Sequence, residues 1–441
     1  MIRRMATNPI SQFPAGFLWG VSTSAHQIEG AADEREPSVW DAFTAEPGRV
    51  KDGSTAAVAC DHYHRYAEDV ALLADLGVDA YRFSVSWPRV NSPGGLDFYD
   101  RLVDELCAAG VRPVPTLFHW DLPLALDWLD RDTAARFAEY AARVAERLGD
   151  RVSKWITLNE PAEHTLLGHA LGAHAPGRQL LFDALPVAHH QLLAHGLAVR
   201  ALRAAGVTDI GIANSHGPTW PASQESADLE AAAFYDILLN RLFSDPLLLG
   251  RYPEGIGELM PGDSASIESD LKIIAEPIDW YGINYYAPTR VGAPQGAEIE
   301  FGGLTLPAEL PFSVREIEGH PVTDFGWPVV PQALTELLTG FRERFGDRLP
   351  PIVITENGCS YEGIDDQERI AYLDGHVRAL HRAVEAGVDV RGYFVWSLLD
   401  NFEWAEGYER RFGLVHVDYD TLERTPKASY GWLRDALRAR R

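Results

Sequence analysis

Two glutamates stand where a pair of carboxyl groups could carry out chemistry. Glu160 follows an apolar run at residues 155–158, in the string Thr157-Leu158-Asn159-Glu160-Pro161, and Glu356 follows another at 352–355, in Ile354-Thr355-Glu356-Asn357-Gly358. Both runs favour β structure, so each carboxyl group is expected at the carboxyl end of a strand. The two glutamates lie 356 − 160 = 196 residues apart, and only a fold that gathers strand ends can bring them together. Two carboxyl groups facing each other across a pocket are suited to cleaving glycosidic bonds.

A repeated unit of amphipathic helix, glycine and short apolar strand predicts how the strand ends are gathered. The first copy places Tyr63, Tyr66, Val70 and Leu73 on one helical face and ends at Gly77, which suits a left-handed helix cap. Later copies pass through Gly110, Gly149, Gly206, Gly346 and Gly387. The expected strands are residues 17–22, 80–85, 114–118, 155–158, 210–214, 278–283, 352–355 and 390–396. Eight strands alternating with helices predict an α/β fold, a closed parallel (β/α)8 TIM barrel.

The remaining residues are expected to serve this one barrel. An open doubly wound sheet is the competing architecture, but it would place a phosphate-binding glycine loop after an early strand, and the sequence has none there. Residues 215–277 and 291–330 are longer than ordinary connections, so we expect them to form extended loops over the C-terminal face of the barrel. We expect residues 1–441 to form a single catalytic domain, with residues 1–12 as a flexible N-terminal extension.

Composition argues against several classes of partner. The net charge of −25 disfavours binding to nucleic acid or to an anionic membrane surface.

Cys60, Cys107 and Cys359 are odd in number and widely spaced, so we expect buried thiols, no disulfide framework and a cytoplasmic location. Residues 6–17 contain no apolar run long enough for a signal peptide, so we expect none, and no run approaches the ~18–20 apolar residues that a membrane span needs. The histidine pairs near residues 62 and 189 lack a supporting ligand cluster, so no metal is expected. The oligomeric state stays open.

Polar and aromatic residues follow the expected strands in a pattern that suits a sugar. Amide, imidazole and carboxylate groups can bind hydroxyls, and indole faces can stack on the C–H face of a pyranose. The residues at or just after the strand ends are Gln27, Arg82, His119, Trp120, Asn159, Glu160, Asn214, Asn284, Tyr286, Glu356, Trp396, Glu403 and Trp404.

These residues and their flanking strings resemble those of the family 1 glycoside hydrolases, the β-glucosidase family. The matching strings include Gln27-Ile28-Glu29-Gly30, Phe118-His119-Trp120-Asp121-Leu122-Pro123, Asn284-Tyr285-Tyr286 and Trp396-Ser397-Leu398-Leu399-Asp400-Asn401-Phe402-Glu403-Trp404. They run in family order from residue 13 to about residue 434. The resemblance implies a cofactor-free retaining exo-β-glucosidase, with side activity on β-galactosides or β-fucosides and a cis peptide between Trp396 and Ser397.

The resemblance also implies a role for each site residue. Glu356 would be the nucleophile and Glu160 the acid/base, and Arg82 and Tyr286 would hold Glu356 ionised. Because an ionised Glu356 disfavours a second charge nearby, Glu160 should stay protonated near neutral pH. The expected substrate-binding residues are Gln27, His119, Trp120, Asn159, Asn284, Trp327, Trp396, Glu403 and Trp404, with Trp396 as the floor and Trp327 beside the aglycone.

Single residues distinguish between subfamilies, while other questions stay open. Glu160 is present, unlike in the thioglucosidases of plants, and the intact Glu403-Trp404 pair favours a free sugar over a 6-phosphosugar. The loops at residues 91–96 and 125–131 are shorter than is usual in the family, and we expect them to border the aglycone site. A transglycosylating β-glycosidase and a non-catalytic β-glycoside-binding barrel remain as alternatives.

Overall fold

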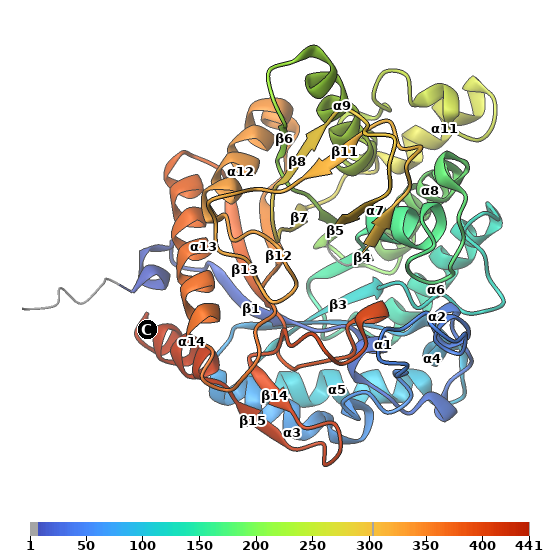
Figure 1. Ribbon diagram of the computed structural model, residues 1–441. Helices are drawn as coiled ribbons and strands as arrows, with labels where there is room; N and C mark the ends of the chain where they lie inside the picture. The colour runs from blue at the N-terminus through green and yellow to red at the C-terminus, as the bar shows by residue number, and fades with distance from the viewer. Residues whose placement is uncertain (1–7, 302–303, 441) are drawn as a thin grey trace, which may run out of the picture.

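A closed barrel of eight parallel strands forms the centre of the molecule (Figure 1). The computed structural model describes residues 8–301 and 304–440. The barrel strands are β1 (Leu18–Ser22), β2 (Ala80–Ser84), β3 (Arg112–Phe118), β4 (Trp155–Asn159), β5 (Ile210–Ser215), β7 (Trp280–Asn284), β12 (Ile352–Asn357) and β13 (Val390–Trp396). Each predicted strand is found within two residues of its expected bounds, so the (β/α)8 prediction is confirmed.

Helices surround the barrel because each presents one apolar face to the strands. α6 (Asp132–Leu148) is a clear case: it buries Phe137, Tyr140, Ala141 and Val144, which recur at helical spacing. The other large helices are α3 (His62–Leu76), α5 (Gly95–Ala108), α8 (Leu185–Ala204), α12 (Pro331–Phe345), α13 (Gln367–Glu385) and α14 (Ala428–Arg438). Short helices lie in the connections: α1 (Ala25–Ile28), α2 (Val39–Thr44), α4 (Trp87–Asn91) and α7 (Pro161–Glu163).

Side chains from every strand fill the interior of the barrel. One buried layer takes a single residue from each strand: Leu18, Ala80, Val114, Ile156, Ala213, Trp280, Val353 and Phe394. Large rings in this layer require glycine on the neighbouring strand. A Cβ atom at Gly20 would lie 2.3 Å from the ring of Phe394, and one at Gly211 would lie 2.5 Å from the ring of Trp280. The barrel is therefore a packed core, and the site must lie at its end.

The two long insertions do not both lie over the barrel mouth as expected. The first insertion contains β6 (Thr219–Pro221) and α9 (Ser226–Asp236). β6 joins β8 (Thr289–Gly292) and β11 (Ser313–Arg315) in a separate three-stranded sheet (Figure 1). The rest of that insertion, α10 (Leu242–Leu249) and α11 (Ser264–Ile274), packs against α8 instead. The prediction is wrong for this half because its apolar residues join the outer helical layer. Two small hairpins complete the fold: β9 (Ile299–Phe301) with β10 (Leu304–Leu306), and β14 (Val415–Val417) with β15 (Arg424–Pro426).

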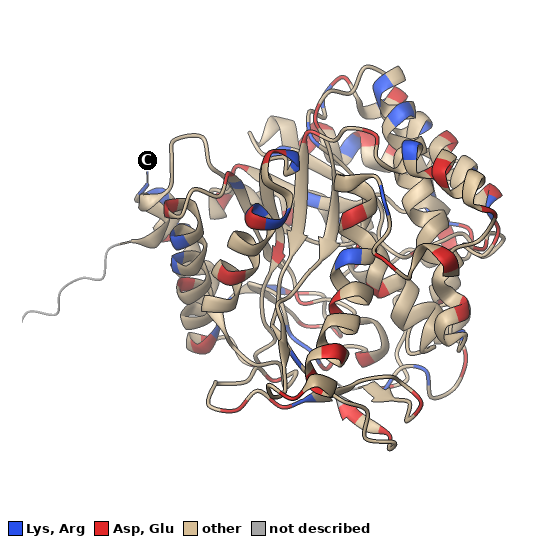
Figure 2. Ribbon diagram, turned by 90° about the horizontal axis from the view of Figure 1, so that it is seen from above, with Lys and Arg blue, Asp and Glu red and all other residues tan. Residues whose placement is uncertain are grey.

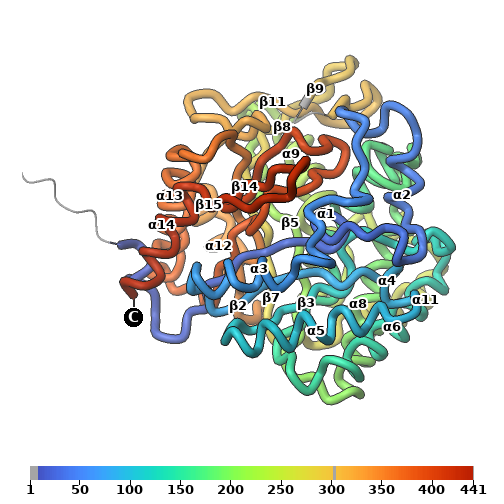
Figure 3. The backbone as a smooth tube through the Cα atoms, turned by 90° about the horizontal axis from the view of Figure 1, so that it is seen from below, coloured from blue at the N-terminus to red at the C-terminus, as the bar shows by residue number. Residues whose placement is uncertain are grey.

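The start of the described chain is packed against its end. Residues 1–7 of the expected extension lie outside the described residues, but Pro9–Gln12 form a 3-10 helix and Ile10 is buried. The Asn8 side-chain amide donates to the carbonyl oxygen of Ala436 at 2.8 Å. Figure 3 shows this N-terminal segment beside α14. The expectation of a flexible extension is therefore wrong for residues 8–12.

The cysteines differ in their exposure, and the charged residues lie mainly outside the barrel. Cys60 and Cys359 are buried as expected, but Cys107 is exposed, because it lies ~100° around α5 from its buried neighbour Leu106. Charged residues lie mainly on the outer helices and loops (Figure 2). In the described part of the chain, no helix is long and apolar enough to cross a membrane.

A buried ion pair fixes the loop that follows β13. Asp400 accepts hydrogen bonds from the Lys427 ammonium at 2.8 Å and from the backbone N–H of Gly413 at 2.9 Å, and Arg411 lies 3.3 Å away. The side chains of both Asp400 and Lys427 are fully buried. This pair joins the loop that carries Glu403 to the start of α14.

Replacing Lys427 by methionine should therefore destabilise the protein. We expect Lys427→Met to lower the free energy of unfolding by ~3 kcal/mol, because it leaves the buried Asp400 carboxylate without its closest cation. Urea denaturation followed by tryptophan fluorescence measures the change. Lys272→Met on the exposed face of α11 is the matched control, and equal midpoints for the two variants would contradict the argument.

Candidate active site

One cavity of about 580 Å³ opens at the carboxyl ends of the barrel strands and contains both glutamates. The predicted residues that line it are His119, Trp120, Glu160, Tyr286, Trp327, Glu356, Trp396, Glu403 and Trp404. The other predicted residues, Gln27, Arg82, Asn159 and Asn284, are buried and hydrogen-bonded to lining residues. Asn214 is not part of the site, because its side-chain amide donates to the Tyr281 hydroxyl at 2.7 Å.

Glu356 is held by a cation and a hydroxyl. The register of β12 shifts next to this residue, and such irregularities redirect side chains. One carboxylate oxygen accepts from the Arg82 guanidinium at 2.5 Å, and the other accepts from the Tyr286 hydroxyl at 2.7 Å. Glu356 is only 3% exposed. A charge-assisted ion pair and a hydroxyl donor therefore hold both carboxylate oxygens of this buried group in place.

Arg82 is fixed in turn by three other strands. Its guanidinium donates to the Thr116 hydroxyl on β3 at 3.1 Å, to the Asn159 side-chain oxygen on β4 at 2.6 Å and to the carbonyl oxygen of Thr355 on β12 at 3.1 Å. The side chain is fully buried. The charge that faces Glu356 is therefore set by the barrel and not by a mobile loop.

Glu160 has a different environment. It follows β4 with a positive φ of 45°, a conformation uncommon for a residue with a side chain and recurrent at functional sites. Its carboxyl group accepts from the side-chain amides of Asn284 at 2.9 Å and Asn159 at 3.4 Å. Burial raises the pKa of Glu160 well above its ordinary value, and the charge of Glu356 raises it further. The two carboxyl groups therefore differ in their surroundings: Glu356 contacts a cation, whereas the raised pKa of Glu160 favours its protonated form.

A group of polar side chains suited to hydroxyls lies beside Glu356. The Gln27 amide donates to the Glu403 carboxyl group at 3.3 Å. Burial raises the pKa of Glu403 to about 8, with a further contribution from Glu356. Asn159 donates to Nε2 of His119 at 3.1 Å, and burial followed by the charge of Arg82 lowers the pKa of His119 well below its ordinary value. The His119 ring is therefore neutral near pH 7.

Aromatic rings line two sides of the cavity. The ring of Trp404 lies 4.7 Å from that of Trp120 and 6.0 Å from the nearly parallel ring of His119. Trp120 donates its indole N–H to the carbonyl oxygen of Asn159 at 3.0 Å, which anchors this wall. Trp327 contacts Tyr286 edge to face at 5.3 Å. The expected cis peptide between Trp396 and Ser397 is present.

Among the lining residues that the sequence analysis did not name, two polar ones lie close to Glu160. Glu163 and Ser215 both border the cavity, and the Ser215 hydroxyl donates to the Glu163 carboxyl group. Burial raises the pKa of Glu163, and its charge contributes to the raised pKa of Glu160. The sequence carried no helical signal for this arrangement, because Glu160 precedes α7 in a left-handed conformation and only Glu163 lies in the helix.

The loops expected to border the aglycone site do not line the cavity in the described residues. Asn91, in the first loop, donates to Glu36 at 2.6 Å, and Asp127, in the second, pairs with Arg178. The outer walls come instead from residues 163–185, 215–217, 235–240, 286–289 and 304–328. Connections after β4, β5 and β7 therefore replace those after β2 and β3 as the borders of the outer cavity.

Comparison with known proteins places this geometry in a family. The model of glycosyl hydrolase family 1 matches residues 10–441. β-Glucosidase A of Acetivibrio thermocellus is 42% identical over 97% of this chain and 98% of its own length, and a bifunctional β-D-glucosidase/β-D-fucosidase of Bifidobacterium breve is 42% identical over 96% and 97%. The crystal structure of a psychrophilic β-glucosidase from Micrococcus antarcticus superimposes with a TM-score of 0.92 at 45% identity, covering 98% of this chain and 99% of that one.

The contact between Glu163 and Ser215 yields a prediction about Glu160. Removing the Glu163 charge should lower the pKa of Glu160, because a nearby negative charge disfavours ionisation of a carboxyl group. Carbon-13 NMR of protein labelled at the glutamate carboxyl carbon measures this in Glu163→Gln, with the Glu160 resonance assigned by its loss in Glu160→Gln.

A surface variant provides the control for this titration. Glu343 on α12 is exposed and does not line the cavity. Glu343→Gln removes the same charge, and solvent screening should leave the pKa of Glu160 unchanged. If Glu163→Gln also leaves it unchanged, Glu163 is itself neutral and does not act on Glu160.

Proposed function

The chain belongs to glycosyl hydrolase family 1, and from this premise we propose that Glu356 and Glu160 divide between them the two steps of β-glucoside hydrolysis. The protein is a retaining β-glycosidase of the β-glucosidase type, with β-fucosidase activity as a side activity. The observation that carries the assignment of roles is the difference between the two carboxyl groups of one cavity. Glu356 contacts a guanidinium, whereas Glu160 contacts only amides.

In the first step Glu356 acts as the nucleophile and Glu160 as the acid. A carboxylate oxygen of Glu356 attacks the anomeric carbon while Glu160 gives its proton to the glycosidic oxygen, and the bond between that oxygen and the anomeric carbon breaks. The aglycone leaves as a neutral alcohol, and the sugar is bound to Glu356 as an ester. The raised pKa of Glu160 supports this role, because the residue must hold its proton near neutral pH.

In the second step Glu160 acts as the base. Esterification removes the charge of Glu356, which is one cause of the raised pKa of Glu160, so that pKa falls once the intermediate has formed. Glu160 has already lost its proton and now takes one from water, whose oxygen attacks the anomeric carbon and releases Glu356. Two inversions at that carbon give a product of retained configuration.

The polar group beside Glu356 is proposed to bind the terminal sugar. His119 supports this proposal, because its Nδ1 has no hydrogen-bond partner among the described residues although its Nε2 is occupied. Gln27 and Glu403 provide further acceptors and donors for hydroxyls, and the rings of Trp396 and Trp404 provide flat apolar faces. Asn159 contacts His119, and both Asn159 and Asn284 contact Glu160. A cytoplasmic location is also proposed, on the basis of three free cysteines.

Proton NMR of 4-nitrophenyl β-D-glucoside hydrolysis tests the proposed reaction directly. We expect β-glucose to appear first and α-glucose to follow only at the rate of mutarotation, because double displacement retains the configuration. A spectrum in which α-glucose appears first would rule out a glycosyl-enzyme intermediate. Absence of turnover on any β-glycoside would leave a binding protein.

Variants of the two glutamates test their separate roles. Glu356→Ala should lower kcat by a factor on the order of 10⁴ or more, and azide should restore turnover with α-glucosyl azide as the product. Glu160→Ala should lower the rate of hydrolysis of 4-nitrophenyl β-D-glucoside by about 10²–10⁴-fold. With a dinitrophenyl leaving group, which needs little protonation, the rate of the first step should fall much less.

Glu343→Ala serves as the control for both variants, because this residue is exposed on α12. Its rates should equal those of the unmodified protein. A Glu356→Ala variant that keeps the unmodified rate, or azide rescue that gives the β-azide, would show that Glu356 is not the nucleophile.

A further inference from the structure

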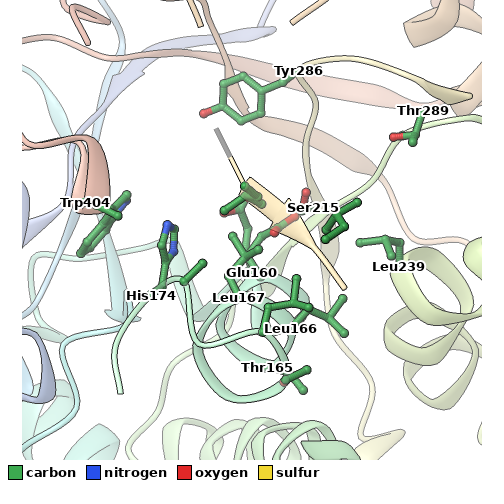
Figure 4. Close-up of a pocket in the computed structure, with 18 of the residues that line it drawn as sticks. Glu160, Thr165, Leu166, Leu167, His174, Ser215, Leu239, Tyr286, Thr289 and Trp404 are labelled. Atoms are coloured by element: carbon green, nitrogen blue, oxygen red, sulfur yellow. The ribbon is translucent and has the colours of Figure 1, made fainter. Parts of the chain in front are cut away.

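The cavity continues past the catalytic pair into a region of different chemistry. Figure 4 shows Trp404 on one side of Glu160 and Leu239 on the other, with Leu166 and Leu167 below. We call the second side the leucine lobe, and its lining includes Leu166, Leu167, Leu238, Leu239, Leu310 and Phe312. These residues come from the segment after β4 and from the two insertions.

The leucine lobe presents apolar surface to the cavity. Leu166, Leu167 and Leu239 are neither fully buried nor on the outer surface, and they border the cavity. At its edge Leu181 and Phe182 are 36% and 40% exposed. Apolar side chains gathered around an open cavity are typical of a site that binds an apolar group.

The wall of the lobe is packed rather than loose. Leu238 and Phe312 belong to a buried cluster with Ala231, Ala232 and Val291, and Leu239 and Leu310 pack against it. The cluster joins α9 to the sheet of β6, β8 and β11. The leucines are therefore presented by a supported surface, which lowers the entropic cost of binding.

Polar groups near the lobe are already bonded to the protein. The side chain of Asn240 accepts from or donates to His216, Gly217 and Asp236. The Thr165 hydroxyl accepts from Gln191 at 2.9 Å, and Ser215 donates to Glu163. A second sugar here would bury hydroxyls opposite leucine, and a buried hydroxyl without a partner is costly.

We propose that the leucine lobe selects β-glucosides whose aglycone is a bulky apolar alcohol, such as a medium-length alkyl chain, over those whose leaving group is another sugar. This inference rests on the proposed function, because the aglycone reaches the lobe only when the glucosyl group lies at the catalytic pair.

A series of n-alkyl β-D-glucosides separates binding from chemistry. Straight-chain alcohols have nearly equal acidity, so the barrier to bond cleavage should not change with chain length. Burial of each added methylene should raise kcat/KM by about two- to fourfold. We expect kcat/KM for octyl β-D-glucoside, measured below its micelle concentration, to exceed that for the methyl glucoside by at least ~100-fold and to exceed that for cellobiose.

Substitution of the lobe should change this dependence on chain length. Leu239→Asn and Leu167→Asn keep the branched shape and the number of side-chain heavy atoms but introduce polar groups, and each should lower the octyl-to-methyl ratio of kcat/KM by about tenfold. Leu229 lies on the same helix as the lobe cluster but is 42% exposed and does not line the cavity. Leu229→Asn should keep the ratio of the unmodified protein.

The outcomes separate this inference from the proposed function. The inference is overturned if the octyl-to-methyl ratio of kcat/KM stays near one, or if kcat/KM for cellobiose is higher than that for octyl glucoside. Either result leaves the β-glucosidase assignment intact. Equal ratios in Leu239→Asn, Leu167→Asn and Leu229→Asn overturn it as well. Failure to hydrolyse even 4-nitrophenyl β-D-glucoside overturns both.

Discussion

A charged carboxylate buried beside a second carboxyl group is the constraint on which this structure depends. Burial of an unpaired charge is strongly unfavourable, so Glu356 requires a cation, and Arg82 meets this need from β2, which β13 and β1 separate from β12. Arg82 is itself buried and must be satisfied, and β3, β4 and β12 each supply an acceptor. The closed barrel provides these acceptors from fixed backbone positions, because adjacent strands hold one another in register.

The same constraint separates the two ends of the cavity. Near Glu356 hydrogen bonds connect Arg82, Asn159, His119, Asn284 and Glu160, and Gln27 separately contacts Glu403. Beyond Glu160 the cavity is lined mainly by leucine and phenylalanine side chains from the connections after β4, β5 and β7. The strand layer fixes the charges, whereas the lobe comes from the segment after β4 and from the two insertions. Chemistry and aglycone choice are thus encoded in different parts of the chain.

Much of the fold and the catalytic centre could be predicted, because local patterns mark them. Glycines between an amphipathic run and an apolar run located six of the eight barrel strands, and the resemblance to a family located the polar and aromatic residues around the two glutamates. Tertiary contacts determined what was missed. A helical pattern at α11 does not say that the helix packs on α8, and Asn8 is fixed by a carbonyl at the other end of the chain. The length of a loop also does not indicate whether it folds towards the cavity. Residues 91–96 and 125–131 were therefore wrongly expected to border the aglycone site.

Asn159 shows how such a network can determine a property that neither sequence nor burial gives alone. Its side-chain oxygen accepts from Arg82 at 2.6 Å and from Asn284 at 2.9 Å, so its amide nitrogen must face His119. An amide nitrogen can only donate, and Nε2 of His119 must therefore accept. In a neutral ring the proton then lies on Nδ1, the nitrogen without a partner among the described residues. The guanidinium that pairs with Glu356 thereby also sets His119 as a hydrogen-bond donor, which is the form that can bind the oxygen of a sugar hydroxyl.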